Sequence, residues 1–449
     1  MQGRRVALID GDSRFDLVVP LRARVDDVLR AAGVDAARGT RVVGIAGREI
    51  DRSTAMTAFD DGVVLVIVDP GAAAPGAAAR SRSGANAVRV SAVWWVLAAG
   101  GGILALVRLL GGDGLPTAVR GPVAVLAVLA ALVAGAVFAI RARPHTATLA
   151  PVVGLVALAF GGGVAVVPEL PASSSLVAVF TGLLAGAVVA GVIGVLGATD
   201  TLRAQSRTAA ILLAGLSAVW GVSLLMHLDP AAPAAVTVGL VPVAQRILQS
   251  SLVDVAPGTF IDYGRFQSTR WTVRQNLPDE VRTIEADDAD ALVERSTARL
   301  SIGVVLLVAA GAASAFTALP SFDTSNPVVL GGRIALASTV VLALLLSSRR
   351  STVPFLRWVE RLGAAAIVAA VLTALLPAVS PELLVLVAAI LLFVGLGSAL
   401  LVVPVGRGLR SLGWSRTGDI FEALATALSL PAGMLAAGAV EIARAMMAT

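Results

Sequence analysis

The sequence contains no cysteine, no lysine and only two histidines among its 449 residues. It therefore offers no disulfide, no thiolate metal site and no cysteine nucleophile, and two histidines are too few for a histidine metal centre. Charged residues make up only 14% of the chain, compared with roughly 25% in typical soluble domains. These absences exclude an ordinary soluble enzyme, and we expect neither a metal nor a cofactor.

Apolar residues dominate instead. Hydrophobic residues form 57% of the chain, and the mean hydropathy is +0.87, so most of the protein is predicted to lie in lipid. The net charge of +5 comes entirely from arginine. Because the arginines form no basic stripe along the sequence, nucleic acid is not an expected partner.

The first 70 residues differ from the rest, because arginine and acidic residues are nearly equal in number there. Strands are predicted at 5–9, 14–19, 41–45, 47–50 and 63–68, with one helix at 25–32. This order is that of the β-grasp fold, so we expect an α+β ubiquitin-like domain at 1–70. Another small α+β module, such as a ferredoxin-like one, is the alternative. No free Gly-Gly ends the segment, so this domain is expected to bind or brace and not to conjugate.

The segment at 71–88 is rich in Ala, Gly and Ser and is predicted to be a flexible linker. No signal peptide precedes it, because the apolar stretch at 6–9 is far shorter than a signal core and is followed by Asp10 and Asp12. The N-terminus is therefore expected to stay in the cytoplasm.

The remainder, 89–446, is predicted to be an all-α polytopic membrane domain. A helix needs about 20 mostly apolar residues to cross the hydrocarbon core. This rule predicts eleven transmembrane helices, near 90–110, 120–140, 146–167, 175–198, 208–227, 233–253, 300–319, 328–347, 362–379, 384–404 and 420–443.

Arginine in the connections predicts the orientation. Alternate connections carry most of the arginines, and the others carry acidic residues such as Asp113, Glu169 and Asp229. The positive-inside rule places the arginine-rich set, with the N-terminal domain, in the cytoplasm. The chain is thus predicted to be a multi-pass protein of the inner membrane. Because the number of spans is odd, its C-terminus is expected outside the cytoplasm.

One connection, at 254–299 between the sixth and seventh helices, is long. Its second part is acidic, and Pro278-Asp279-Glu280 favours a helix that extends into the next span. Its first part combines arginine with aromatic side chains, which are enriched at protein interfaces and also anchor at lipid headgroups. We favour partner docking for this part, through Arg265, Phe266, Arg270, Trp271 and Arg274.

The spans offer little chemistry. No carboxylate lies near the middle of a span, as ion coupling usually requires, and Glu360, Glu422 and Glu441 fall at span ends, where solvent exposure is the simpler expectation. Gln245 and Arg246 are the deepest polar pair, which either lines a wet cavity or reaches back to the surface. Neither a Walker motif nor a Ser/His/Asp set is present, so the chain is not expected to be an enzyme.

Glycines recur within one apolar span, at Gly182, Gly186, Gly191 and Gly194. They follow no strand, so a phosphate-binding loop is not expected. Small residues let membrane helices approach closely, and we interpret these four as helix-packing positions.

A ubiquitin-like head, a short linker and eleven spans with a long connection after the sixth resemble the EccD family of the type VII (ESX) secretion system. The arginine-rich, lysine-free composition also suits an actinobacterium. The resemblance implies a non-enzymatic scaffold or channel-forming subunit that dimerises around a lipid-facing vestibule. It implies EccB, EccE and the ATPase EccC as partners, with the head and the 254–299 connection holding the cytoplasmic side of EccC.

The alternative is a stand-alone permease or lipid transporter with a regulatory head. An odd number of spans fits poorly with two equal inverted repeats, and the missing midplane carboxylate argues against ion coupling. An integral-membrane enzyme would need clustered polar groups at a span end, and only 245–254 offers any.

Overall fold

The computed structural model describes most of the chain. The described residues are 3–10, 13–20, 22–32, 41–44, 49–59, 62–68, 77–109, 117–143, 149–168, 174–252, 286–320, 322, 326–351, 353–375, 380, 412–448 and isolated positions between 385 and 396.

The N-terminal domain is a five-stranded mixed sheet with one helix. The strands are β1 (Gly3–Asp10), β2 (Ser13–Pro20), β3 (Arg41–Gly44), β4 (Glu49–Ile50) and β5 (Val63–Val68), and α1 spans Val25–Ala31. The sheet order is β2-β1-β5-β3-β4, in which only the central pair, β1 and β5, is parallel. This is the β-grasp topology, so the predicted ubiquitin-like fold is confirmed.

Alternation along the strands builds the core of this domain. Val6 and Leu8 of β1 and Leu65 of β5 are buried and pack against Val25 and Leu29 of α1, because every second residue of a strand faces the same side. The backbone N–H of Arg24 donates to Asp27 Oδ2 at 2.9 Å and closes the first turn of α1. Gly62, at φ +84°, leads into β5 with a backbone conformation that few other residues adopt.

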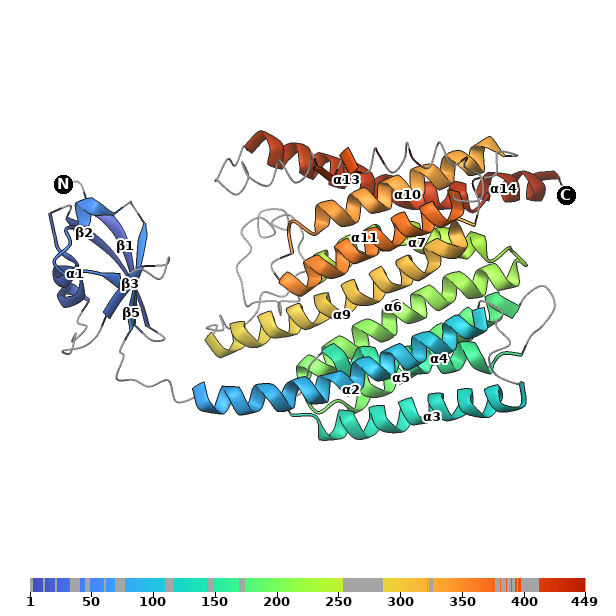
Figure 1. Ribbon diagram of the computed structural model, residues 1–449, viewed down its shortest axis with the longest axis horizontal. Helices are drawn as coiled ribbons and strands as arrows, with labels where there is room; N and C mark the ends of the chain where they lie inside the picture. The colour runs from blue at the N-terminus through green and yellow to red at the C-terminus, as the bar shows by residue number, and fades with distance from the viewer. Residues whose placement is uncertain are drawn as a thin grey trace, which may run out of the picture. The chain divides into compact units, whose positions relative to one another are not determined.

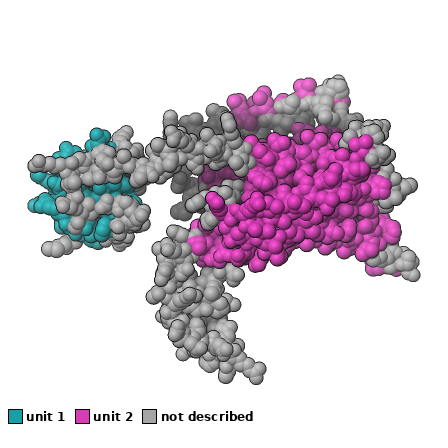
Figure 2. Space-filling view, turned by 90° about the horizontal axis from the view of Figure 1, so that it is seen from below, with its two compact units in different colours: residues 1–90 teal, residues 91–449 magenta. Residues whose placement is uncertain are grey.

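The chain divides into two compact units, residues 1–90 and 91–449 (Figure 2). Helix α2 (Ala77–Leu109) begins within the segment that we expected to be a flexible linker. Alanines at 77–79 and the arginines at 80 and 82 have high helix propensity, and this accounts for the early start.

Ten helices in the described part of the chain are long and apolar enough to cross a membrane. After α2 they are α3 (Thr117–Arg141), α4 (Leu149–Val166), α5 (Ser174–Leu196), α6 (Asp200–Leu225), α7 (Ala231–Ser250), α9 (Ala286–Ala318), α10 (Pro327–Ser347), α11 (Pro354–Leu375) and α13 (Leu412–Ala436). They confirm ten of the predicted spans. The remaining one, at 384–404, lies outside the described residues except for isolated helical positions.

Several helices begin before the spans that hydropathy predicts. Helix α6 starts at Asp200 because the Thr199 side chain accepts a hydrogen bond from the N–H of Leu202 at 3.3 Å and caps it. Helix α9 starts at Ala286, so the end of the 254–299 connection is helical, as its acidic composition indicated. Hydropathy does not detect these polar first turns, because they extend beyond the apolar window.

The last span was predicted at 420–443, and the predicted end at 443 is wrong. Helix α13 stops at Ala436, and a separate short helix, α14 (Ala439–Ala448), follows. Gly438 between them has φ +75°, a left-handed conformation that ends a helix. The sequence carried this signal in Gly438 itself, but the apolar residues on both sides masked it.

Helix α4 lies at the centre of the first half of the bundle (Figure 1). Within its span 72% of the residues are buried, compared with 17% for α2. The sequence of α4 contains no charged residue and is built from Gly, Ala, Val and Leu with one Phe and one Pro. A helix that contacts protein on every side needs this uniformly apolar, small-residue surface.

Helices α2 and α4 make the closest backbone approach that we observe. A Cβ at Gly101 would lie 2.2 Å from the carbonyl oxygen of Ala157, and a Cβ at Gly161 would lie 2.0 Å from that of Gly101. At the end of α2, the buried Arg108 donates to the carbonyl oxygens of Val167 and Pro168 at 3.1 and 3.0 Å. A cation is favourable there because the last carbonyls of α4 have no helical partners.

Helices α7 and α13 meet in the same way. A Cβ at Gly239 would lie 2.5 Å from the carbonyl oxygen of Ser429, and a Cβ at Gly433 would lie 2.8 Å from that of Ala235. The buried Ser429 hydroxyl donates to the Gly239 carbonyl at 2.8 Å. Helices far apart in the sequence are thus joined by glycine contacts and one interhelical hydrogen bond.

Gly101→Ala should destabilise the bundle, and its neighbour provides the control. The added methyl group would force α2 away from α4, a type of overpacking that costs about 1–3 kcal/mol. Gly102→Ala should be neutral or slightly stabilising, because nothing lies within 4 Å of a Cβ there and alanine favours helix. Thermal unfolding of both variants in detergent checks this. Equal melting temperatures for the two would contradict the close approach of α2 and α4.

Candidate functional site

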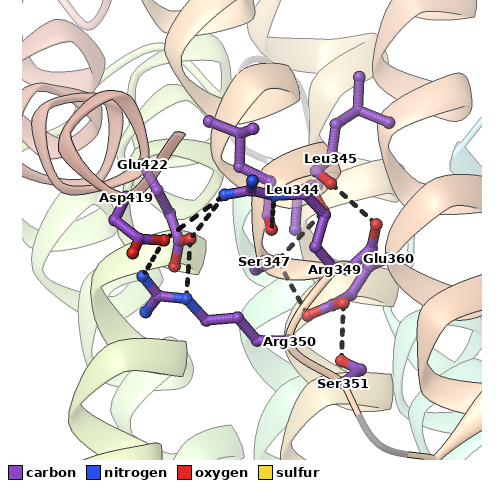
Figure 3. A network of polar contacts seen from close by, with 11 residues as sticks. Leu344, Leu345, Ser347, Arg349, Arg350, Ser351, Glu360, Asp419 and Glu422 are labelled. Atoms are coloured by element: carbon purple, nitrogen blue, oxygen red, sulfur yellow. Dashed lines mark hydrogen bonds and ion pairs between the residues drawn. The ribbon is translucent and has the colours of Figure 1, made fainter. Parts of the chain in front are cut away.

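A charged cluster joins the α10–α11 turn to α13 (Figure 3). Arg349 and Arg350 follow the end of α10, and Asp419 and Glu422 lie one turn apart on α13. Arg350 Nη2 lies 2.8 Å from Asp419 Oδ1, and Arg350 Nε lies 3.3 Å from Glu422 Oε2. Arg349 Nη2 lies 3.6 Å from Asp419 Oδ1 and 4.0 Å from Glu422 Oε2. Both arginines therefore hold the same pair of carboxylates.

The cluster is partly shielded from solvent. The Glu422 side chain is 10% exposed, whereas those of the arginines and Asp419 are about half exposed. The hydrogen bond to Asp419 raises the pKa of the Arg350 guanidinium above its ordinary value. Gly418 makes room for this arrangement, since a Cβ there would lie 2.5 Å from Arg349 Nη1.

Glu360 of α11 lies beside the same turn and is buried, with 1% of its surface exposed. Its carboxylate accepts hydrogen bonds from the hydroxyl groups of Ser347 at 3.0 Å and Ser351 at 3.1 Å. These two serines flank Arg349 and Arg350 in the sequence. Glu360 therefore fixes the turn against α11 while the arginines fix it against α13.

The expectation that Glu360 and Glu422 are exposed at span ends is wrong. Both are buried, because two hydroxyl groups donate hydrogen bonds to Glu360 and the charge of Glu422 is paired with that of the arginines. The sequence carried a signal, namely two carboxylates inside apolar helices at the end where an arginine pair also lies. What it could not give was the contact between α10, α11 and α13.

The four glycines predicted to pack helices differ from one another in how closely a neighbouring helix approaches them. A Cβ at Gly182 would lie 2.6 Å from Val164 Cγ2 of α4, and one at Gly194 would lie 3.2 Å from Arg207 Cγ of α6. A Cβ at Gly186 would lie 3.4 Å from Leu213 Cδ1, which is an ordinary van der Waals contact. Nothing lies within 4 Å of a Cβ at Gly191, so its role in packing stays a prediction.

Gln245 and Arg246 are not brought together. Gln245 is buried, and its Nε2 has no hydrogen-bond partner, whereas Arg246 is exposed on the outside of the bundle. Successive residues of a helix point about 100° apart, which explains the separation. The five residues predicted to dock a partner, Arg265, Phe266, Arg270, Trp271 and Arg274, lie outside the described residues.

Within the described residues, no group of three or more His, Asp or Glu side chains could hold a metal ion. The carboxylates of the charged cluster pair with arginine and serine side chains, so the cluster holds the α10–α11 turn, α11 and α13 together. We call it the arginine–carboxylate clamp. A buried polar clamp of this kind fixes one arrangement of its elements.

Comparison with solved structures identifies the fold. A chain in the structure described as protomer 1 of the ESX-3 core complex superposes with a TM-score of 0.51 and 17% identity, covering 98% of this chain and 100% of that chain. A chain of the MycP5-free ESX-5 inner membrane complex, in its State II, superposes with a TM-score of 0.51 and 16% identity. The match covers 89% of this chain and 99% of that chain. The chain matches no protein-family model and no curated protein sequence. The fold predicted from the sequence is confirmed over nearly its whole length.

Arg350→Met should destabilise the bundle, because it leaves the buried Glu422 with only the longer contact to Arg349. Breaking a buried ion pair by removing one partner costs about 3–5 kcal/mol, and a partly exposed pair such as this one costs less. The double variant Arg350→Met/Glu422→Met should recover most of the loss, since replacing both partners of a pair by apolar residues is close to neutral. Thermal unfolding in detergent measures both. A double variant no more stable than the single one would show that the pair does not clamp the helices.

Proposed function

We propose that this chain is the EccD-type membrane subunit of a type VII secretion complex. The observation that supports this most strongly is the fold, which matches chains of two ESX membrane complexes over 98% and 89% of this chain. A ubiquitin-like domain attached to ten or more apolar helices is a specific combination. Similarity over 98% of the chain extends to both parts.

In this role the chain is a scaffold and not an enzyme. The membrane helices are joined by glycine contacts and by the arginine–carboxylate clamp, an arrangement suited to a rigid frame. Two copies enclose a lipid-facing vestibule in the inner membrane, and EccB and EccE complete the assembly. The energy for transport comes from EccC, the ATPase partner, because the sequence has no nucleotide-binding motif of its own.

The proposed topology places the N-terminal domain in the cytoplasm and the C-terminus outside. The absence of cysteine makes this directly testable. Single cysteines replace two exposed residues, Val18 in β2 and Met447 in α14, which are 74% and 80% exposed. In intact cells, a membrane-impermeant maleimide should label Met447→Cys and leave Val18→Cys unlabelled.

Detergent-solubilised protein is the control for that experiment, because both cysteines should react once the membrane is removed. Labelling of Val18→Cys in intact cells, or equal protection of both positions, would contradict the proposed orientation.

The proposed docking of EccC uses the ubiquitin-like domain and the connection at 254–299. The first part of the connection contains three arginines, Arg265, Arg270 and Arg274, with Phe266 and Trp271 between them. Changing the three arginines to Glu and Trp271 to Ala should abolish co-purification of the ATPase at physiological salt, because arginine and aromatic residues dominate the energetics of such interfaces.

The matched control changes the same arginines to Lys and keeps Trp271. It preserves the charge and should retain most of the ATPase. Intact complex recovered with the charge-reversed variant would remove this docking role. A small particle with no partner, in both the variant and the unaltered protein, would instead favour a stand-alone permease or lipid transporter.

A further inference from the structure

The first two turns of α11 carry a pair of arginines on the surface of the bundle. Arg357 and Arg361 are both exposed and are four residues apart, so their side chains are neighbours on one face of the helix. Two like charges at this spacing repel each other and destabilise the helix that carries them. An anion bound between the two arginines would remove that repulsion.

No carboxylate supplies this negative charge among the residues that the structure describes. Glu360 accepts hydrogen bonds from two serines, and the carboxylates of α13 belong to the arginine–carboxylate clamp. Within the described part of the chain, neither Arg357 nor Arg361 forms an ion pair. Arg357 Nε donates to the Ser351 carbonyl oxygen at 2.6 Å, which leaves its two Nη groups for a ligand.

The pair lies at a depth where lipid phosphates are within reach. All of α11, Pro354–Leu375, is apolar enough to cross a membrane. Arg361 is in the second turn, about 10 Å along the helix axis from its start. A charged side chain that faces lipid at this depth is costly unless it reaches the headgroups or meets an opposite charge. The phosphate of a lipid headgroup meets both requirements.

Apolar side chains on the same face fit the remainder of a lipid. Trp358 and Leu362 are 61% and 64% exposed, and Phe355, one turn before Trp358, is 44% exposed. The Arg361 guanidinium carbon lies 5.6 Å from the centre of the Trp358 ring, so a cation–π contact holds the charge beside this apolar surface. Tryptophan is enriched where hydrocarbon meets headgroups. A free anion would use only the arginines, whereas a lipid uses both parts of the face.

We propose that Arg357 and Arg361 bind the phosphate of an anionic phospholipid such as phosphatidylglycerol, with Trp358 and Leu362 against its glycerol backbone and acyl chains. Phosphatidylcholine has the same phosphate, but its trimethylammonium group brings a positive charge back beside the arginines. The proposed orientation places this end of α11 in the cytoplasmic leaflet, whose anionic lipids attract arginine. The site requires only that α11 crosses the membrane, and it does not depend on a role in secretion.

The test uses full-length protein stripped of native lipid in a neutral detergent. Dioleoyl phosphatidylglycerol and dioleoyl phosphatidylcholine are added separately, and native mass spectrometry measures the affinity of each. One arginine near an anionic lipid contributes about fivefold in affinity, so phosphatidylglycerol should bind about twentyfold more tightly. Equal affinity for the two lipids would overturn the proposal.

Variants assign the preference to the arginine pair. Arg361→Gln should lose about fivefold in affinity for phosphatidylglycerol and leave that for phosphatidylcholine unchanged. Arg416→Gln is the matched control. Arg416 is also exposed and begins the α13 span at the same end of the bundle, but Leu412 and Ile420, not arginines, are four residues from it. It should keep the full preference. An equal loss in both variants, or no loss in Arg361→Gln, would overturn the proposal.

Thermal unfolding separates lipid binding from a role in the fold. Without lipid, Arg361→Gln should melt at the temperature of the unaltered protein or slightly above it, because the repulsion with Arg357 is gone. Added phosphatidylglycerol should stabilise the unaltered protein more than the variant. A variant that is less stable without lipid but gains the full stabilisation would show that Arg361 supports the fold, and would overturn the proposal.

A cross-linking experiment identifies the occupant in the native membrane. Because the chain has no cysteine, Leu362→Cys can carry a single photoreactive maleimide label. On illumination, adducts with the mass of anionic phospholipids should predominate. An adduct with a protein, or with lipids in their bulk proportions, would overturn the anionic lipid as the occupant.

Discussion

Close approach between helix backbones is the constraint on which this structure depends. Lipid tails are as apolar as leucine, so the hydrophobic effect does not drive membrane helices together, and van der Waals packing has to do so. Here that packing is obtained where glycines face one another, at Gly101 and Gly161 between α2 and α4 and at Gly239 and Gly433 between α7 and α13. A single Cβ at any of these positions would collide with the backbone of the neighbouring helix.

Charge has a second and complementary role. The arginines and carboxylates of the membrane domain gather at the ends of helices, where their desolvation costs less than in mid-membrane. Arg108 caps α4, and the clamp of Arg349 and Arg350 ties the α10–α11 turn to α13. Glycine contacts along the helices and ionic contacts at their ends together describe a rigid frame. Such a frame suits a subunit that supports other proteins.

Much of this could be predicted from the sequence, and the reasons are physical. Strand alternation and turn residues predicted the ubiquitin-like domain, and runs of apolar residues predicted ten described spans, because both signals are local. The burial of Glu360 and Glu422 could not be predicted, since it depends on which helices become neighbours. Gly438 shows the opposite case, where a local signal was present but was outweighed by the apolar residues around it.

The central claim is that the chain is one subunit of a large secretion complex. The most direct measurement is gentle extraction from the native membrane, followed by the particle mass and by mass spectrometry of everything that co-purifies. The account predicts a particle far heavier than a dimer of this 45.3 kDa chain, containing an FtsK-like ATPase and further membrane subunits. A particle of one or two copies with no partner protein would contradict it.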